Sequence, residues 1–244
     1  MDRLIYLAMA GAKATMARQD VLANNLANAS TTGFRAELQA FRAVPVRGDG
    51  ASTRVYALES TVGHDDRAGP TQATGRALDV AVQGRSWLAV QALDGSEAYT
   101  RAGSLQVQPD GQLVTPAGLP VLGDGGPINA PPDSTIDIAG DGTVSARGPD
   151  GKLQTLGRLK LVTPESPSDL TRGADGLFRA AEGDLPADPA ARLQSGALEG
   201  SNVSPVETMV AMIAAARQFE QQMKVLQGAE QRDQSATRLL GPAA

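Results

Sequence analysis

The chain has few or none of the residue types on which many active sites depend. It contains no cysteine and one histidine, His64, among 244 residues. These absences exclude disulfide bonds, zinc–thiolate sites, iron–sulfur clusters, cysteine nucleophiles and two-histidine zinc motifs. Aromatic residues make up only 3% of the chain, which is too few for a surface on which nucleobases stack. We therefore expect no metal and no cofactor.

The charge balance and the apolar runs exclude two further classes. The 22 basic and 27 acidic residues give a net charge of −5, without the basic excess of a nucleic-acid-binding protein. No purely apolar run approaches the roughly 18 residues that a membrane-spanning helix requires. The opening residues MDRLIYLAMAGA imitate a short signal peptide. Because Asp2 offsets Arg3 and the amphipathic spacing continues past Lys13, we expect no cleavage there.

Glycine and proline are concentrated in the middle of the chain. All but four of the 27 glycines (Gly11, Gly33, Gly228 and Gly241) and all but two of the 15 prolines (Pro205 and Pro242) lie between residues 42 and 200. Neither residue occurs between Ala12 and Thr32 or between Val206 and Gln227. This spacing predicts a helix at each end and a turn-rich region between them.

The N-terminal helix is predicted from about Asp2 to about Asn28, and Gly33 provides a stop signal just beyond it. Residues along it recur with the 4, 3 spacing of a heptad seam, although three of them are not large and apolar. The members are Ile5, Met9, Ala12, Met16, Gln19, Ala23 and Leu26.

The C-terminal helix has a clear start signal. Ser204 is a predicted N-cap, Pro205 occupies the first helical position and Glu207 completes a capping box. Its seam then follows with 3, 4 spacing: Met209, Met212, Ala216, Phe219, Met223 and Leu226.

The C-terminal helix is predicted to need a partner. Its five large apolar seam residues contribute about 1.5–3 kcal/mol each when buried, on the order of 10 kcal/mol together. Ordering the backbone costs about 1–2 kcal/mol per residue, which intrahelical bonds offset only in part. The seam can dock on the chain's own β domain, pair with the first helix, or pair with other chains. Docking on the chain's own β domain is the ordinary outcome, and the location of both seams outside the β region raises the expectation of the other two.

The middle of the chain is predicted to form short strands. Alternating or apolar runs occupy residues 77–82, 87–91, 105–108, 113–114, 120–122 and 159–162. Asp-Gly pairs, typical of tight hairpin turns, begin at residues 49, 94, 110, 124, 141, 150 and 175. We predict an α+β protein in which a central, mainly-β sandwich or barrel-like domain is flanked by the two terminal helices.

Several patterns that suggest chemistry have simpler interpretations. The Asp-Gly pairs lack the ligand set of an EF-hand calcium loop, so we interpret them as turns. Residues 123–126 are glycine-rich but lack the Lys-Ser/Thr pair of a phosphate loop. His64, followed by Asp65 and Asp66, has no nucleophile in a recognisable motif and is predicted to be an exposed loop residue. No enzyme is predicted.

An asparagine cluster lies near the end of the first helix. Asn24, Asn25 and Asn28 are poor helix formers. They either cap the helix end through competing backbone bonds or fix the register between packed helices. The residue pattern leaves both interpretations open.

The segment from Ala23 to Arg35, ANNLANASTTGFR, resembles the N-terminal signature of the bacterial flagellar rod and hook proteins. Further blocks extend the resemblance over nearly the whole chain and are most similar to members of the proximal rod. These blocks lie at residues 1–6, 42–46, 78–83, 99–104, 157–162, 198–203 and 217–225.

The resemblance implies a structural subunit of the rod that crosses the periplasm, exported by the flagellar export apparatus without a cleaved signal peptide. It implies that residues 1–34 and 201–244 pair as a coiled-coil-like inner layer. It further implies that residues 35–75 are an extended linker and residues 76–200 a β-rich outer domain. The implied partners are copies of the chain and neighbouring proximal and distal rod proteins. The implied subunit-interface residues are Asn24, Asn25, Leu26, Asn28, Thr31, Gly33, Phe34, Gly200, Ser201, Asn202, Val203, Met209, Met212, Phe219, Met223 and Leu226.

Three alternatives remain at this level. Within the same class, the chain is a distal rod or hook-like axial subunit. From another class, it is a secreted β-rich module that binds a ligand. A hydrolase is the third alternative, and it would depend on His64.

Overall fold

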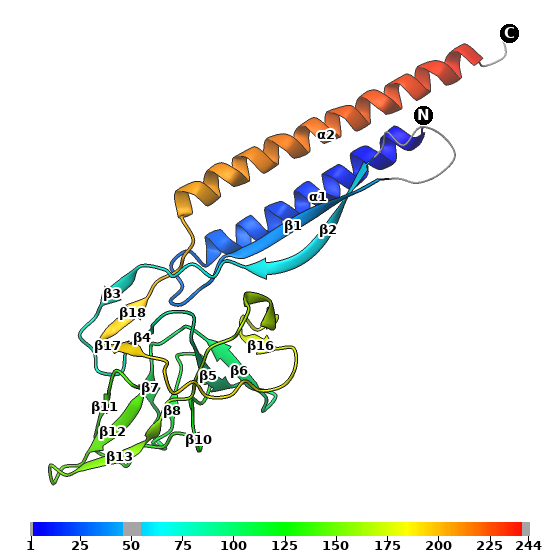
Figure 1. The fold of residues 1–244 in the computed structure, drawn as a ribbon. Coiled ribbons are helices and arrows are strands. Elements are labelled where there is room, and N and C mark those ends of the chain that lie inside the picture. The colour runs from blue at the N-terminus through cyan, green and yellow to red at the C-terminus, as the bar shows by residue number, and fades with distance from the viewer. Residues whose placement is uncertain (1, 46–54, 241–244) are drawn as a thin grey trace. The chain divides into compact units, whose positions relative to one another are not determined.

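The computed structural model describes residues 2–45 and 55–240, which form two long helices and a series of short strands (Figure 1). Helix α1 covers Asp2–Ala27 and helix α2 covers Pro205–Leu240. Both helices and the mainly-β region between them agree with the α+β prediction. In the described part of the chain, no helix is long and apolar enough to cross a membrane.

The chain divides into two compact units. Of the described residues, unit 1 contains 2–27, 37–45, 55–62 and 204–240, and unit 2 contains 28–36 and 63–203. The chain therefore passes from one unit to the other four times, after residues 27, 36, 62 and 203.

In unit 1 the two helices run antiparallel and pack along their length (Figure 1). The contact uses small side chains. On α1 the buried residues Ala8, Ala12 and Thr15 follow 4, 3 spacing, and the Thr15 hydroxyl donates to the Gly11 carbonyl at 2.9 Å. On α2 Thr208, Ala215 and Ala229 are buried. Small residues allow the two backbones to approach closely.

A two-stranded sheet completes unit 1. Strand β1 (Glu37–Pro45) pairs with β2 (Val55–His64), and β1 also contacts α1. Residues 35–75, predicted as an extended linker, thus include β1, β2 and the short β3 (Thr71–Ala73).

Unit 2 is built from short antiparallel strands. A five-stranded sheet has the order β14-β5-β6-β16-β15, and a three-stranded sheet has the order β11-β12-β13. Four further pairs are β17-β4, β18-β3, β7-β8 and β10-β9. The bounds are β4 Val80–Val82, β5 Trp87–Gln91, β6 Glu97–Thr100, β7 Gln106–Val107, β8 Leu113–Val114, β9 Leu122–Gly123, β10 Gly126–Pro127, β11 Thr135–Ile138, β12 Thr143–Arg147, β13 Leu153–Arg158, β14 Leu161–Val162, β15 Leu170–Arg172, β16 Phe178–Ala180, β17 Leu193–Ser195 and β18 Ala197–Glu199. The single turn of 3₁₀ helix η1 covers Pro167–Asp169.

Each predicted run overlaps a strand in unit 2. The larger hydrophobic cluster includes Val80, Leu88 and Val121 from three of these runs, all fully buried. A second cluster contains Trp87, Tyr99 and Phe178. The predicted runs do not include β6, β10, the β11-β12-β13 sheet or strands β15 to β18.

The Asp-Gly pairs do form hairpin turns. Gly95, Gly111, Gly142, Gly151 and Gly176 all have positive φ. In each turn the aspartate carboxylate accepts a hydrogen bond from the amide two residues further on, as Asp94 does from Ser96 at 2.9 Å. The pair at residues 124–125 differs, because Gly126 has the positive φ there. The pair at residues 49–50 lies outside the described residues.

Candidate functional site

The asparagine motif joins the end of α1 to the start of β1. The Asn25 side chain, which is buried, donates to the Glu37 carbonyl at 3.0 Å and accepts from the Glu37 amide at 2.8 Å. The Asn24 amide donates to the Glu37 carboxylate at 3.1 Å. Through these contacts Asn24 and Asn25 join the helix to the strand that follows it, a role that the two interpretations made from the sequence did not include.

The chain then turns sharply into unit 2. The Thr31 amide donates to the Asn28 carbonyl and the Thr31 hydroxyl to the Asn28 side chain, both at 3.1 Å. Gly33 has φ +70° and donates to the Glu199 carbonyl at 2.8 Å. A Cβ at this position would lie 2.3 Å from the Arg101 carbonyl carbon, so no other residue fits without a backbone shift.

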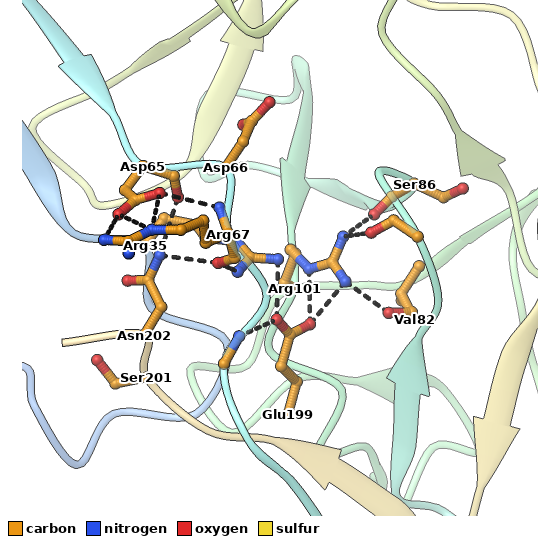
Figure 2. Close-up of polar contacts among 12 residues, drawn as sticks. Arg35, Asp65, Asp66, Arg67, Val82, Ser86, Arg101, Glu199, Ser201 and Asn202 are labelled. Atoms are coloured by element: carbon orange, nitrogen blue, oxygen red, sulfur yellow. Dashed lines mark hydrogen bonds and ion pairs between the residues drawn. The ribbon is translucent and has the colours of Figure 1, made fainter. Parts of the chain in front are cut away.

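Directly after this turn lies a buried ion cluster, which we define as Arg35, Arg101 and Glu199 (Figure 2). One Glu199 oxygen lies 2.8 Å from Arg35, and the other lies 2.7 Å from Arg101. The three side chains are only 2–3% exposed. The Gly69 amide donates to the same carboxylate at 2.9 Å.

Arg101 connects the cluster to the β4–β5 connection. Its guanidinium donates to the Val82 carbonyl at 2.5 Å, to Ser86 at 2.6 Å and to Gly84 at 3.0 Å (Figure 2). The planar fork of arginine can reach these carbonyls and Glu199 together, whereas lysine cannot.

Asn202 is a second centre of polar contacts beside the cluster. Its side-chain oxygen accepts from the Ala36 amide at 2.7 Å, and its side-chain nitrogen donates to the Asp65 and Arg67 carbonyls at 2.9 Å each. Arg35 also donates to the Arg67 carbonyl. Asn202 therefore holds three chain segments together.

The neighbours of Asn202 are held in the same place. Its own amide donates to the Phe34 carbonyl at 3.2 Å. The Gly200 amide donates to Pro70 at 2.9 Å, and the Ser201 hydroxyl accepts from the Val203 amide at 3.2 Å. The structure thus brings Gly33, Phe34 and the 200–203 segment, all named from the sequence, to one location in unit 2.

The cluster holds two cations and one anion. Burial, followed by the nearby Arg101 charge, lowers the pKa of Arg35, while Glu199, Asp66 and Asp65 act in the opposite direction. Carboxylates around Arg35 therefore compensate part of the excess positive charge.

His64 contradicts the expectation of an exposed loop residue. It ends strand β2, and its side chain is 5% exposed. Its ring packs edge-on against Phe178 and Trp87, with centroids 4.8 and 5.8 Å away, and its Nε2 lies 3.0 Å from Asp66. Burial lowers the pKa of His64 despite the opposing effect of Asp66.

On α2 the residues named from the sequence are exposed to different degrees. Met212, Phe219, Met223 and Leu226 are partly buried, whereas Met209 is 50% exposed. On α1 Leu26 is partly buried.

Both helices also present large apolar side chains to solvent. We define the α1 outer stripe as Tyr6, Met9 and Met16, and the α2 outer stripe as Val206, Met209, Val210 and Ile213. All seven residues are at least half exposed. Each helix thus has a face of small side chains toward the other helix and an uncovered stripe of large ones.

The buried ion cluster was not predicted. Arg35, Arg101 and Glu199 all lie within the blocks on which the family resemblance rests, but no role was assigned to them. A single charged residue within a short apolar strand, such as Glu199 in β18, is the signal that could have indicated a buried ion. Among the described residues no group of side chains could hold a metal ion.

The chain is similar to flagellar basal-body rod and hook proteins over nearly its whole length. Residues 5–35 match the family described as flagella basal body rod protein, and residues 194–239 match the C-terminal family of flagellar basal body rod FlgEFG proteins. Residues 81–146 match the D1 domain of flagellar hook protein FlgE/F/G.

Individual relatives agree with these matches. The flagellar basal-body rod protein FlgF of Salmonella typhimurium is 52% identical, and that of Escherichia coli is 51% identical, each over 98% of this chain and 99% of the relative. The flagellar basal-body rod protein FlgG of Bacillus subtilis is 32% identical over 93% of this chain and 94% of the relative.

Proposed function

The chain belongs to the family of flagellar basal-body rod proteins, and from this we propose that it is a structural subunit of the proximal rod. In this role it forms part of the helical shaft that transmits motor torque to the hook and filament. The 52% identity to FlgF of Salmonella typhimurium, against 32% to FlgG of Bacillus subtilis, supports a proximal over a distal or hook-like position. The names of the relatives do not favour a secreted ligand-binding module or an enzyme.

The observation that supports assembly best is the pair of outer stripes. In the single chain, Met9, Met16 and Ile213 are 54, 53 and 56% exposed. Covering such a side chain contributes on the order of 1 kcal/mol, and several aligned along a helix form a continuous apolar surface. The buried positions of the two helices include Ala8, Ala12 and Ala215, and Met212 and Phe219 are partly buried, so these residues are already covered within the single chain. The stripes are therefore available to helices of neighbouring subunits.

We place residues 1–34 and 201–244 in a coiled-coil-like inner layer, residues 76–200 in an outer layer and residues 35–75 as the connection between them. The sixteen residues named from the sequence lie at subunit interfaces in this proposal. Contacts of different surfaces on successive copies do not close, and they generate an open helical assembly.

The partners follow from the same proposal. Copies of the chain and neighbouring proximal and distal rod proteins cover the outer stripes. The flagellar export apparatus delivers the chain without signal-peptide cleavage. The site of action is the basal body, and no cofactor takes part.

The test is a clean deletion of the gene in the source bacterium, examined by swimming assays and electron microscopy of basal bodies. We expect non-motile cells without completed rods and hooks, restored by the intact gene. Normal swimming with complete basal bodies would contradict the proposal.

A further inference from the structure

We propose that the buried ion cluster is the anchor through which unit 2 carries mechanical load. The inference rests on the proposed function, because a subunit of a rotating shaft experiences sustained force. The four passages between the units adjoin three segments of unit 2, namely residues 28–36, the stretch that begins at residue 63 and the stretch that ends at residue 203. Force that enters or leaves unit 2 along the chain passes through these three segments.

Glu199 contacts all three segments. Its carboxylate binds Arg35 of the first segment at 2.8 Å and accepts from the Gly69 amide of the second at 2.9 Å. Its carbonyl accepts from Gly33 at 2.8 Å, and Glu199 itself begins the final stretch toward residue 203. Asn202, which also belongs to the final stretch, contacts the first segment through Ala36 and the second through Asp65 and Arg67 (Figure 2).

Arg101 fixes Glu199 to the body of the unit. It binds the carboxylate at 2.7 Å and three carbonyls of residues 82–86, next to the most deeply buried part of the sheet. Strand β18 pairs with the three-residue β3 and also contacts β4. The ion cluster adds a direct polar link from the exit segments to the β4–β5 connection beside the hydrophobic core.

The ion cluster is better suited to keeping the three segments from sliding past one another than to raising the free energy of unfolding. A buried ion pair often adds no net stability over an apolar replacement. Apolar contact, however, is non-directional, so it does not by itself fix the position of one segment along another. Short hydrogen bonds to an ion hold each segment at one position, and moving any of them leaves a buried charge without its partner.

The first test uses the purified full chain with Glu199→Gln, which keeps the side-chain shape and removes the negative charge. Asp175→Asn is the matched control, because it removes a carboxylate from the exposed Asp175–Arg179 pair in the same unit. In Glu199→Gln we expect the hydrogen-exchange rates of the Gly69 and Asn202 amides to rise at least about tenfold. The exchange rates of the Ala89 and Gln91 amides in β5 should stay within about twofold of wild type. Unchanged exchange at Gly69 and Asn202, or an equal rise in β5, would overturn the proposal.

The second test places the same variants in the source bacterium. Cells with Glu199→Gln should build hooks and swim in dilute medium, but should stop in polymer-thickened medium in which Asp175→Asn cells still swim. Equal loss of speed in the two variants would overturn the proposal. Absence of hooks with Glu199→Gln would also overturn it, since the cluster would then serve assembly instead.

A third variant covers the case in which Glu199→Gln does not fold. Asn202→Ala removes the contacts to Ala36, Asp65 and Arg67 without uncovering a buried charge, and the same criteria apply to it. The gene deletion separates the two proposals. If cells without the gene swim normally, the proposed rod function is contradicted. If they do not swim, but Glu199→Gln cells swim in thickened medium as well as Asp175→Asn cells do, only the proposed load-bearing role of the cluster is contradicted.

Discussion

The turn after α1 requires glycine at residue 33. The φ of Gly33, +70°, and the contact of this residue with the Arg101 backbone both require glycine. We expect Gly33→Ala to lower the free energy of unfolding of unit 2 by at least about 2 kcal/mol, because it adds a backbone clash to the cost of a left-handed conformation. Urea unfolding followed by the fluorescence of Trp87, the single tryptophan, measures this change.

Gly118 provides the control for this prediction. It has a similar φ of +77°, but a Cβ there would meet nothing within 4 Å. Gly118→Ala should therefore lower the free energy of unfolding of unit 2 by only about 1 kcal/mol, because only the backbone conformation disfavours alanine there. Equal losses in the two variants would show that contact with Arg101 is unimportant.

His64 should make unit 2 sensitive to mild acid. Burial lowers its pKa, so below pH about 6.5 the unfolded chain binds a proton that the folded chain does not. Stability is fully present above that pH and is lost as the pH falls toward the lowered pKa. Burial, the largest cause, disfavours the protonated ring, as do Arg35 and Arg172, and together they outweigh Asp66, which favours it.

The measurement is urea unfolding of the wild type and of His64→Gln between pH 7.5 and about 5. Glutamine does not titrate, so the variant should lose less stability over this range than the wild type. Parallel pH profiles would contradict the assignment to His64. Acidic residues that do not contact His64 contribute equally to both profiles, since their surroundings are the same in both proteins.

At the scale of elements, the sequence predicted what depends on local signals. Both helices were found from the glycine and proline spacing, and the hairpin turns from Asp-Gly pairs. Strands β11 to β13 and β15 to β18 were missed, because their burial patterns are set by long-range neighbours. The predicted seams are partly right, because Ala12 is buried and Met212, Phe219 and Leu226 are partly buried. Met9, Met16 and Met209 are at least half exposed, and Ala8, Thr15 and Thr208 are buried beside them. A search that favours large apolar residues misses the positions at which small ones make the contact.

The close packing of small residues between α1 and α2 can be tested by enlarging one of them. Ala215 is 1% exposed, so Ala215→Leu should overpack the α1–α2 contact and cost about 1–3 kcal/mol. The adjacent Ala214 is exposed, and Ala214→Leu should change stability by less than about 0.5 kcal/mol. Thermal unfolding followed by the helical circular dichroism signal distinguishes the variants. Similar midpoints for the two would argue against close packing at Ala215.

At the scale of the whole molecule, chain topology determines what the sequence cannot reveal. The family signature correctly directed attention to the segments at residues 28–36 and 200–203. It did not indicate that Arg101 binds Glu199, since 98 residues separate them. Such a pairing depends on how β6 and β18 are brought together, which no local pattern encodes. Segments were therefore predictable, while the buried charges that join them were not.

The outer stripes connect the single chain to the assembly, and Ile213 is the position that tests this connection most cleanly. It is 56% exposed on α2, so Ile213→Glu should leave the free energy of unfolding of the isolated chain within about 0.5 kcal/mol of wild type. In an assembled rod the same substitution would bury an unpaired carboxylate against a neighbouring helix, at a cost of several kcal/mol. Cells carrying it should consequently lack completed rods and hooks.

Gln221→Glu is the matched control, because Gln221 is exposed on the same helix beyond the α2 outer stripe and the substitution adds the same charge. These cells should swim normally, and both purified variants should melt like wild type. Normal basal bodies with Ile213→Glu would mean that the stripe stays uncovered in the rod. Loss of rods together with a low melting temperature would instead attribute the defect to folding. Only a stable chain that fails to assemble agrees with a stripe whose role is to be covered by another subunit.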